Sequence, residues 1–297
     1  MIGKVWVALS EEQGGRLGLL MLAVKPLRKM ARMADVSEHI RGMTAEEAYY
    51  CSARSRTPAR ARGPRRRYAS SSPRNKIPLE AVQMPVPVPT PIVRLIHVDN
   101  LHICLRRGGI HASNFTPQDG LVYKTIHNTD IQQQRRVRPV PCGPGGVIHD
   151  YVPFYLGHLS PMLLQLKTGR VSGYTDGQRP LIYLVSTAQA VRDAGREFVF
   201  SDGHGIAAFT HWFDDLASLD KVDWDMVYQQ YRADNINDMD RQRRKQAEFL
   251  VHHFCDWSLI HEIAVFDLLA KAAVEQILNQ IPSQHPPAVV IRGGWYY

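Results

Sequence analysis

One carboxylate in an unusual setting is the first candidate for chemistry. Glu248 lies in the stretch RQRRKQAEFLV (241–251), where a basic, polar approach ends and an apolar run begins. A carboxylate bordered by Ala247 and Phe249 loses hydration unless partners replace it, and such groups are enriched at functional sites. Strand-edge glutamates that only face solvent are also common. The residues alone therefore make Glu248 the leading catalytic candidate, with a structural role as the alternative.

Other polar side chains gather where predicted strands end. They are His97, Asp99, Asn100, Arg135, Arg136, Arg138, His149, Asp150, Ser160 and His204. This distribution is typical of a site that loops assemble over a sheet. Structural roles remain as alternatives for several of them: Asp99 is suited to cap a helix, and His149 and Asp150 could instead secure the tight GGV turn.

The elements that must position these groups alternate between strand and helix without a regular repeat. We expect strands at 92–96, 181–185, 198–201, 247–253 and 260–266 and an edge strand at 288–292, with helices at 99–108, 210–219 and 268–280. A further helix is expected to begin at a capping box of Ser186 and Gln189 and to end at Gly195. The chain lacks the GxGxxG turn of a doubly wound dinucleotide fold, and its glycine-rich turn at 143–146 lacks the GK[ST] ending of a P-loop. The pattern indicates an α+β fold.

Charge is distributed unevenly along the 297 residues. Residues 1–80 hold 16 of the 36 Lys and Arg residues and 7 of the 28 acidic ones, so the remainder holds 20 basic and 21 acidic groups. A near-neutral remainder does not indicate a protein that tracks nucleic acid through a broad basic groove. The stretch 52–74, SARSRTPARARGPRRRYASSSPR, has too few large apolar side chains to form a core. We expect 1–83 to be a largely disordered extension, whose place in the native protein the sequence leaves open, and 84–297 to be the folded domain.

The cysteines and the apolar runs bear on the compartment. Cys51, Cys104, Cys142 and Cys255 are far apart and form no CxxC pair, which argues against a disulfide framework and a metal site. The apolar run near residues 17–24 is too short to span a bilayer, and acidic residues precede it where a signal peptide would be basic. We expect a cytoplasmic protein without a membrane span.

Six motifs in a fixed order carry a family resemblance. They are LIHVDNL, then IQ…RR…VP…GGVIHDYVPFY, SPML, STAQAV…G…FVFSDGHG, KQAEFLV and a terminal WYY. From about Pro91 to Tyr297 the chain resembles the DarT family, toxins that use NAD to ADP-ribosylate single-stranded DNA, and it is similar to the thymidine-modifying branch. The resemblance implies an ADP-ribosyltransferase fold, with two apposed β-sheets and flanking helices.

The resemblance also implies two catalytic residues. Glu248 stands at the position of the family's catalytic acid, where a carboxylate stabilises the positive charge that develops on ribose as nicotinamide leaves. Arg135 matches the arginine beside the target base. Thymine N3 must lose a proton to become a nucleophile, and a guanidinium stabilises the anion that results.

Further contacts follow from the same resemblance. The residues expected at NAD are Arg94, His97, Asn100, Arg135, Ser160 and Met162, and those expected at the DNA are His204, His149, Arg136 and Tyr151. No metal is implied. Two positions depart from the family pattern. Arg94 replaces a histidine that contacts NAD, although arginine also suits phosphate, and Leu164 replaces an aromatic residue.

The sequence thus predicts an NAD-dependent enzyme that transfers ADP-ribose to thymidine in single-stranded DNA and releases nicotinamide. The alternatives are a transferase of the same fold that acts on guanine, RNA or protein, an enzyme that only hydrolyses NAD, and a non-catalytic relic that binds nucleic acid or an antitoxin. The resemblance implies a macrodomain antitoxin as a partner, and we expect the active form to be a monomer.

Overall fold

The computed structural model describes residues 3–6, 21–24, 83–230 and 233–297. It divides into two compact units, Met1–Lys76 and Ile77–Tyr297. In the first unit, β1 (Gly3–Trp6) and β2 (Met21–Val24) pair as antiparallel strands, which the sequence did not predict. The rest of the expected disordered extension lies outside the described residues. Among the described residues, no helix is long and apolar enough to cross a membrane.

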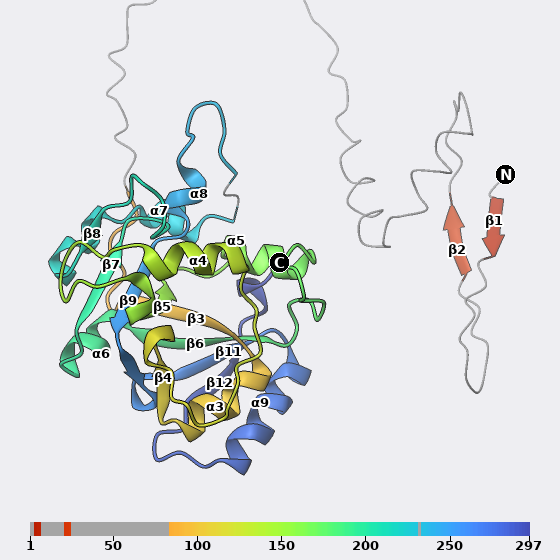
Figure 1. The fold of residues 1–297 in the computed structure, drawn as a ribbon. Helices are drawn as coiled ribbons and strands as arrows, with labels where there is room; N and C mark the ends of the chain where they lie inside the picture. The colour runs from red at the N-terminus through yellow and green to blue at the C-terminus, as the bar shows by residue number, and fades with distance from the viewer. Residues whose placement is uncertain (1–2, 7–20, 25–82, 231–232) are drawn as a thin grey trace, which may run out of the picture. The chain divides into compact units, whose positions relative to one another are not determined.

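An eight-stranded sheet organises the second unit, in the order β12-β11-β6-β3-β5-β9-β7-β8 (Figure 1). Its strands are β3 (Pro91–His97), β5 (Tyr151–Tyr155), β6 (Leu181–Thr187), β7 (Phe198–Ser201), β8 (Trp212–Phe213), β9 (Glu248–His252), β11 (Glu262–Val265) and β12 (Ala288–Ile291). Strands β3 and β6 pair over the whole length of β3, whereas β3 and β5 meet at a single position, Val93 opposite Tyr155. The sheet is therefore two four-stranded halves joined at one point. This confirms the predicted ADP-ribosyltransferase fold with two sheets.

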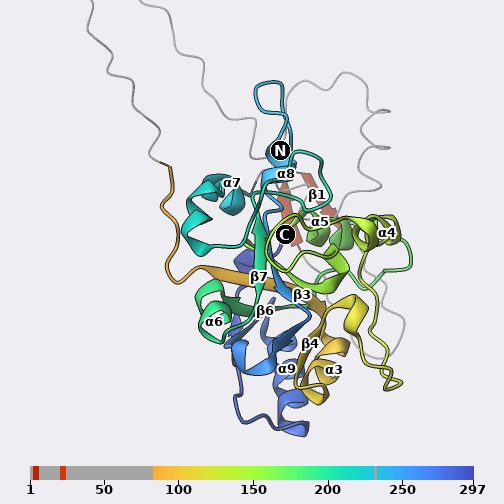
Figure 2. The same ribbon diagram turned by 60° about the vertical axis from the view of Figure 1, so that its left-hand side comes forward.

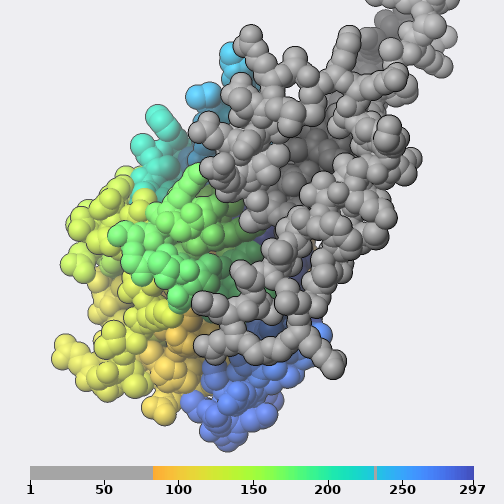
Figure 3. All heavy atoms as spheres, turned by 90° about the vertical axis from the view of Figure 1, so that its right-hand side faces the viewer, coloured from red at the N-terminus to blue at the C-terminus, as the bar shows by residue number. Residues whose placement is uncertain are grey.

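Helices and a small second sheet flank these strands. The helices are α3 (Leu101–Arg106), α4 (Thr129–Val137), α5 (Pro161–Lys167), α6 (Ala188–Asp193), α7 (Trp224–Tyr228), α8 (Arg241–Arg244) and α9 (Leu268–Gln280). Strands β4 (Gly109–His111) and β10 (Phe254–Asp256) pair antiparallel. Helices α4 and α5 lie next to each other near one end of the unit, and α3 and α9 lie near the other (Figures 1 and 2). In the space-filling view the segments around α4 and α5 adjoin on one face (Figure 3).

Both faces of the central strands are buried. Ile92, Ile96, Ile182 and Leu184 pack into one apolar cluster, and the alternating residues of β3 and β6 pack into another. A strand that is covered on both faces needs a continuous apolar run, because its side chains alternate between the faces. The run LIYLV of β6 meets this need and gives the site a rigid support.

Most predicted elements are confirmed, and two details are wrong. The helix α6 is capped by Thr187, whose side chain accepts a hydrogen bond from the backbone N–H of Ala190, and not by Ser186. The predicted helix at 210–219 is instead the strand β8 followed by a 3-10 helix at Leu216–Lys221. Asp215 begins this 3-10 helix by capping Ala217, which interrupts the helical pattern that the apolar residues suggested.

Candidate active site

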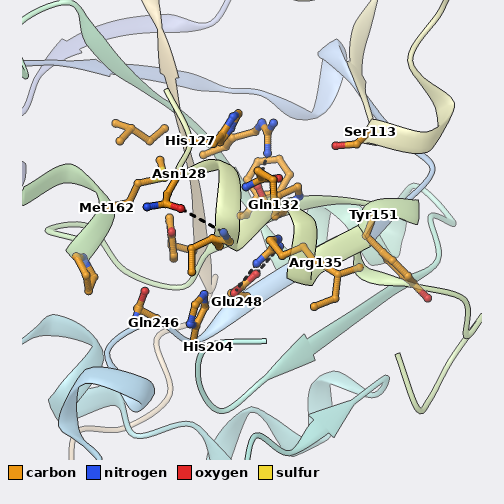
Figure 4. Close-up of a pocket in the computed structure, with 18 of the residues that line it drawn as sticks. Ser113, His127, Asn128, Gln132, Arg135, Tyr151, Met162, His204, Gln246 and Glu248 are labelled. Carbon is orange, nitrogen blue, oxygen red and sulfur yellow. Dashed lines mark hydrogen bonds and ion pairs between the residues drawn. The ribbon is translucent and has the colours of Figure 1, made fainter. Parts of the chain in front are cut away.

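A pocket of about 270 Å³ opens among α4, α5, β3, β5 and the segments on either side of α8 (Figure 4). Seven residues predicted from the sequence line it: Arg94, Arg135, His149, Tyr151, Met162, His204 and Glu248. They are contributed by segments that are widely separated in the chain. The fold therefore brings the two predicted catalytic residues, three predicted DNA contacts and the two predicted NAD contacts Arg94 and Met162 into one cavity.

Glu248 and Arg135 form a buried ion pair in this pocket. The two guanidinium nitrogens of Arg135 donate to the two carboxylate oxygens of Glu248, Nη1 to Oε1 at 3.0 Å and Nη2 to Oε2 at 2.8 Å. The backbone N–H of Gly205 donates to Oε1 at 3.1 Å. Only 2% of Glu248 and 7% of Arg135 is exposed. This two-point contact fixes both the position and the plane of the carboxylate.

Local structure explains how the pair meets. Glu248 is the first residue of β9, and its backbone N–H donates to the Ser201 hydroxyl at the end of β7. Arg135 lies in the last turn of α4, a helix that begins where the side chain of Asn128 accepts hydrogen bonds from the backbone N–H groups of Asp130 and Ile131. The chain passes closely over α8 at Gly203, where a Cβ atom would lie 2.9 Å from the Arg243 carbonyl oxygen. The sheet therefore supplies the carboxylate, and a capped helix supplies the cation that pairs with it.

The electrostatics keep both members of the pair ionised. Burial on its own opposes ionisation of Glu248, but the charge and hydrogen bonds of Arg135 outweigh it, so the pKa of Glu248 lies below its usual value. Burial likewise acts to lower the pKa of Arg135, and the Glu248 carboxylate more than compensates, so that this pKa is raised. Near neutral pH Glu248 is therefore a carboxylate and Arg135 a cation, and the two charges compensate each other.

A second arginine brings a positive charge that forms no ion pair with the described residues. Arg94 donates from Nη1 to the Pro153 carbonyl at 2.7 Å, while its Nε atom is buried and has no hydrogen-bond partner among the described residues. Burial lowers the pKa of Arg94. His127, also in the lining, has a pKa lowered to about 4 by burial and by the nearby positive charges of Arg94 and Arg135. Near neutral pH His127 is thus neutral.

Of the four residues predicted to contact DNA, three line the pocket and one does not. His149 contacts Gln132 of α4, with 3.2 Å between Nε2 and Oε1. The Tyr151 hydroxyl donates to the Gly145 carbonyl at 2.6 Å, which ties the glycine-rich turn to the pocket wall. His204 faces the ion pair in Figure 4, and burial lowers its pKa. Arg136 is exposed and lies outside the lining.

Three of the residues predicted to contact NAD also lie outside the lining. His97 accepts a hydrogen bond from the Asp99 backbone and is 3.3 Å from Asp176. Asn100 makes two hydrogen bonds to the backbone of Lys124, one as donor and one as acceptor. Ser160 caps α5 by accepting from the backbone N–H of Leu163. In the structure these side chains hold the loops that surround the pocket.

Sequence reasoning missed several lining residues. His127, Asn128, Ile131, Gln132, Gln165, Gln242 and Gln246 all face the cavity. Residues 128, 131, 132 and 135 recur at the spacing of one helix face. Had α4 been predicted as a helix from its Asn128 cap, this spacing would have placed Ile131 and Gln132 beside Arg135.

The described residues contain no group of three or more His, Cys, Asp or Glu side chains that could hold a metal ion. Cys104, Cys142 and Cys255 are free thiols, while Cys51 lies outside the described residues.

Known proteins resemble this chain over most of its length. A family model described as ssDNA thymidine ADP-ribosyltransferase, DarT, matches residues 93–297, and a model for a domain of unknown function matches residues 3–74. A DNA ADP-ribosyl transferase of Thermus sp. (strain 2.9) is 43% identical over 211 residues, which cover 71% of this chain and 98% of the relative. One of Escherichia coli O127:H6 is 32% identical over 206 residues, 69% of this chain and 93% of the relative.

Solved structures give the same result. The structure of Thermus sp. 2.9 DarT in complex with ADP-ribosylated ssDNA is 41% identical, with a TM-score of 0.68, and the match covers 72% of this chain and 100% of that one. The same protein in complex with NAD+ matches with a TM-score of 0.64, at 41% identity and the same coverage. This chain therefore belongs to the DarT family of single-stranded DNA thymidine ADP-ribosyltransferases.

Proposed function

We propose that this chain transfers the ADP-ribosyl group of NAD to thymidine in single-stranded DNA and releases nicotinamide. Family membership supports the reaction, and the structures of the Thermus relative with NAD+ and with ADP-ribosylated ssDNA support both substrates. The observation that carries the proposal is the ionised Glu248, which Arg135 and Gly205 hold in the pocket.

The pocket residues fit NAD chemically. NAD carries a pyrophosphate, and Arg94 offers a buried Nε–H without a partner among the described residues. Arginine binds phosphate oxygens well because its donors form a planar fork. We assign Arg94 to an anionic part of NAD and Met162, on α5, to the wall beside it. At this position arginine is a reasonable replacement for the histidine found in the family.

Glu248 stabilises the sugar during transfer. The bond between the ribose C1′ and the nicotinamide nitrogen breaks, nicotinamide takes the bonding electrons, and C1′ becomes positively charged. A preorganised carboxylate lowers the free energy of this transition state more than that of the ground state. Because the ion pair already fixes the carboxylate, little reorganisation is needed when the charge develops.

Arg135 acts on the base. Two of the five N–H donors of a guanidinium go to Glu248, and the other three have no partner among the described residues. Thymine N3 gives its proton to solvent water, and these donors stabilise the resulting anion as N3 forms its bond to C1′. Base pairing would engage N3, so the substrate is a single strand.

The experiment is an incubation of the purified full chain with labelled NAD and short oligonucleotides. We expect label on single strands that contain thymine, and none on thymine-free strands or fully paired duplexes. Release of free ADP-ribose without labelled DNA would replace transfer with NAD hydrolysis. Label on thymine-free DNA, on RNA or on the protein itself would assign a different acceptor.

We also propose a macrodomain antitoxin as a partner and a monomer as the active form, as the family resemblance implies. The chain then acts as a toxin in the cytoplasm, where it meets both NAD and single-stranded DNA. Size-exclusion chromatography of the chain, alone and mixed with a macrodomain protein, tests both points. A stable dimer of the chain alone would contradict the monomer.

A further inference from the structure

The aromatic residues 295–297 contact the segments around the pocket. Trp295 stacks on His158, with ring centroids 5.0 Å apart and planes inclined by 9°. Tyr296 contacts the paired strands β6 and β11, and its hydroxyl lies 3.0 Å from the Leu181 carbonyl and 3.1 Å from the Ala264 carbonyl. The C-terminus lies beside α5 in two views (Figures 1 and 2). This aromatic tail has no part in the chemistry derived above.

Tyr297 makes the contact nearest to the site. Its hydroxyl donates to the Leu159 carbonyl at 2.6 Å. The side-chain amide of Gln178 holds the backbone of Tyr297 from both sides, accepting from its N–H at 3.0 Å and donating to its carbonyl oxygen. Two points of attachment therefore fix the direction of the Tyr297 ring.

Leu159 is a strained position. Its φ of 55° lies in the left-handed region, which residues other than glycine seldom occupy. Such a conformation persists where surrounding contacts hold it. Leu159 is also buried, with 6% of its surface exposed. The hydrogen bond from Tyr297 is one of the contacts that hold the carbonyl in this orientation.

The strained residue leads directly into the pocket wall. Ser160 follows it and caps α5, and Pro161, Met162 and Gln165 of that helix line the cavity. Because α5 has only seven residues, a change in the backbone direction at its start moves the whole helix. The position of the Leu159 carbonyl therefore sets where Met162 and Gln165 lie.

We propose that Tyr297 is a positioning residue for NAD binding, acting through Leu159 and α5. This inference rests on the proposed function, because α5 is assigned there to the wall that contacts NAD. Tyr297 does not touch the reacting atoms. It fixes the wall before NAD arrives, so the effect of its hydroxyl falls on the KM for NAD and not on kcat.

Tyr296 provides a matched control. It is the neighbouring tyrosine, and its hydroxyl also bonds to backbone carbonyls, but these belong to β6 and the strand beside it. Tyr296→Phe and Tyr297→Phe each remove a single buried or half-buried hydroxyl. Of the two, only Tyr297→Phe removes a hydrogen bond to Leu159, the residue before the N-cap of α5.

The experiment measures transfer from NAD to a thymine oligonucleotide by the full chain, with urea unfolding of each variant. For Tyr297→Phe we expect the KM for NAD to rise about fivefold with kcat nearly unchanged, because the loss of one hydrogen bond typically changes an equilibrium constant by about this factor. Gln178→Ala should reproduce this rise, because it releases the backbone of the same tyrosine. Tyr296→Phe should lower stability and leave the KM for NAD as in the parent.

Coupling to α5 is tested in a background that carries Met162→Ala and Gln165→Ala. There, Tyr297→Phe should change the KM for NAD less than about twofold, because the side chains that it positions are absent. The inference would be overturned if Tyr297→Phe left the KM for NAD unchanged in the parent background. It would also be overturned if Tyr296→Phe and Tyr297→Phe raised this KM equally, or if Tyr297→Phe raised it by the full fivefold in the Met162→Ala and Gln165→Ala background. If the unaltered chain fails to label thymine DNA, the proposed function fails instead.

Discussion

At the scale of single residues, the buried ion pair joins catalysis to stability. Glu248 and Arg135 are each almost fully buried, and each neutralises the other. When one member of a buried pair is removed, the other is left as an uncompensated charge, which typically costs about 3–5 kcal/mol. A substitution at either position therefore needs a stability measurement beside the activity assay.

Arg135→Lys tests the geometry of the pair. A lysine keeps the charge but offers one ammonium, which cannot bind both carboxylate oxygens in a plane. We expect labelling of thymine DNA to fall by at least about 100-fold and unfolding free energy to fall by about 1–2 kcal/mol. The exposed neighbour Arg136, changed to Lys, should leave both quantities unchanged. Activity near that of the parent in Arg135→Lys would show that charge alone suffices.

The lowered pKa of Glu248 makes a contribution to stability that depends on pH. The folded state binds the proton of this group less tightly than the unfolded state does, so the contribution is complete above the ordinary value near 4.5. It is lost as pH falls through the lower folded pKa. Urea unfolding between pH 7 and pH 3 should therefore show a steeper loss for the parent than for Glu248→Gln. Parallel curves would mean that the pKa is not lowered.

At the scale of elements, six strands of the large sheet were predicted, whereas the strands β5 and β8 and the helix α4 were not. The apolar runs at β3 and β6 identify strands because they are long and rich in branched side chains, and the short β7 is marked by its aromatic residues and valine. Helix α9 was predicted with its observed bounds, since its apolar spacing is regular. Helix α4 is mostly polar, TDIQQQRRV, so its apolar pattern gives little signal.

The site, like the helices, could be predicted only in part from the sequence. Glu248 was predictable because a single acid precedes an apolar strand, and Arg135 because of the family motif. The pairing between them could not be read from the sequence, because the two residues are 113 positions apart and meet only through the tertiary fold. Asn100 and Ser160 were expected at NAD, yet the side chain of Asn100 bonds to the backbone of a neighbouring loop and that of Ser160 caps α5. Short polar residues suit both uses, and only the structure shows which contacts they make.

Asn100→Ala tests that structural role. The substitution leaves the N–H and carbonyl of Lys124 without their partner in the loop before α4. We expect the unfolding free energy to fall by about 2 kcal/mol, measured in urea. Asp99→Ala is the matched control, because it removes an exposed carboxylate that contacts the same lysine and His97 and should cost at most about 1 kcal/mol. Equal losses for the two variants would contradict the assignment.

At the scale of the whole molecule, the chain combines two units of different composition. Residues 1–80 carry most of the excess positive charge, whereas the remainder is almost balanced. The DarT model matches only 93–297, and the Thermus relative is matched over 98% of its length without the first unit. We therefore propose that the second unit is sufficient for catalysis and that the first strengthens electrostatic attraction to DNA.

A chain of residues 77–297 tests this division. We expect its kcat to lie within about twofold of that of the full chain, while its KM for the oligonucleotide depends less steeply on salt. The full chain assayed over the same salt series is the control. Loss of transfer by a stably folded 77–297 chain would show that the first unit contributes to the reaction.

The most direct test of the whole account is the rate of a single turnover by Glu248→Gln with NAD and a thymine oligonucleotide. Glutamine keeps the shape of the side chain and removes its charge, and NAD binding is measured on the same sample by calorimetry. The account predicts that NAD still binds and that transfer slows by at least about 1,000-fold. Transfer at the parent rate by the folded, NAD-binding variant would contradict the claim that the charge of Glu248 stabilises the positive charge on the sugar as nicotinamide departs.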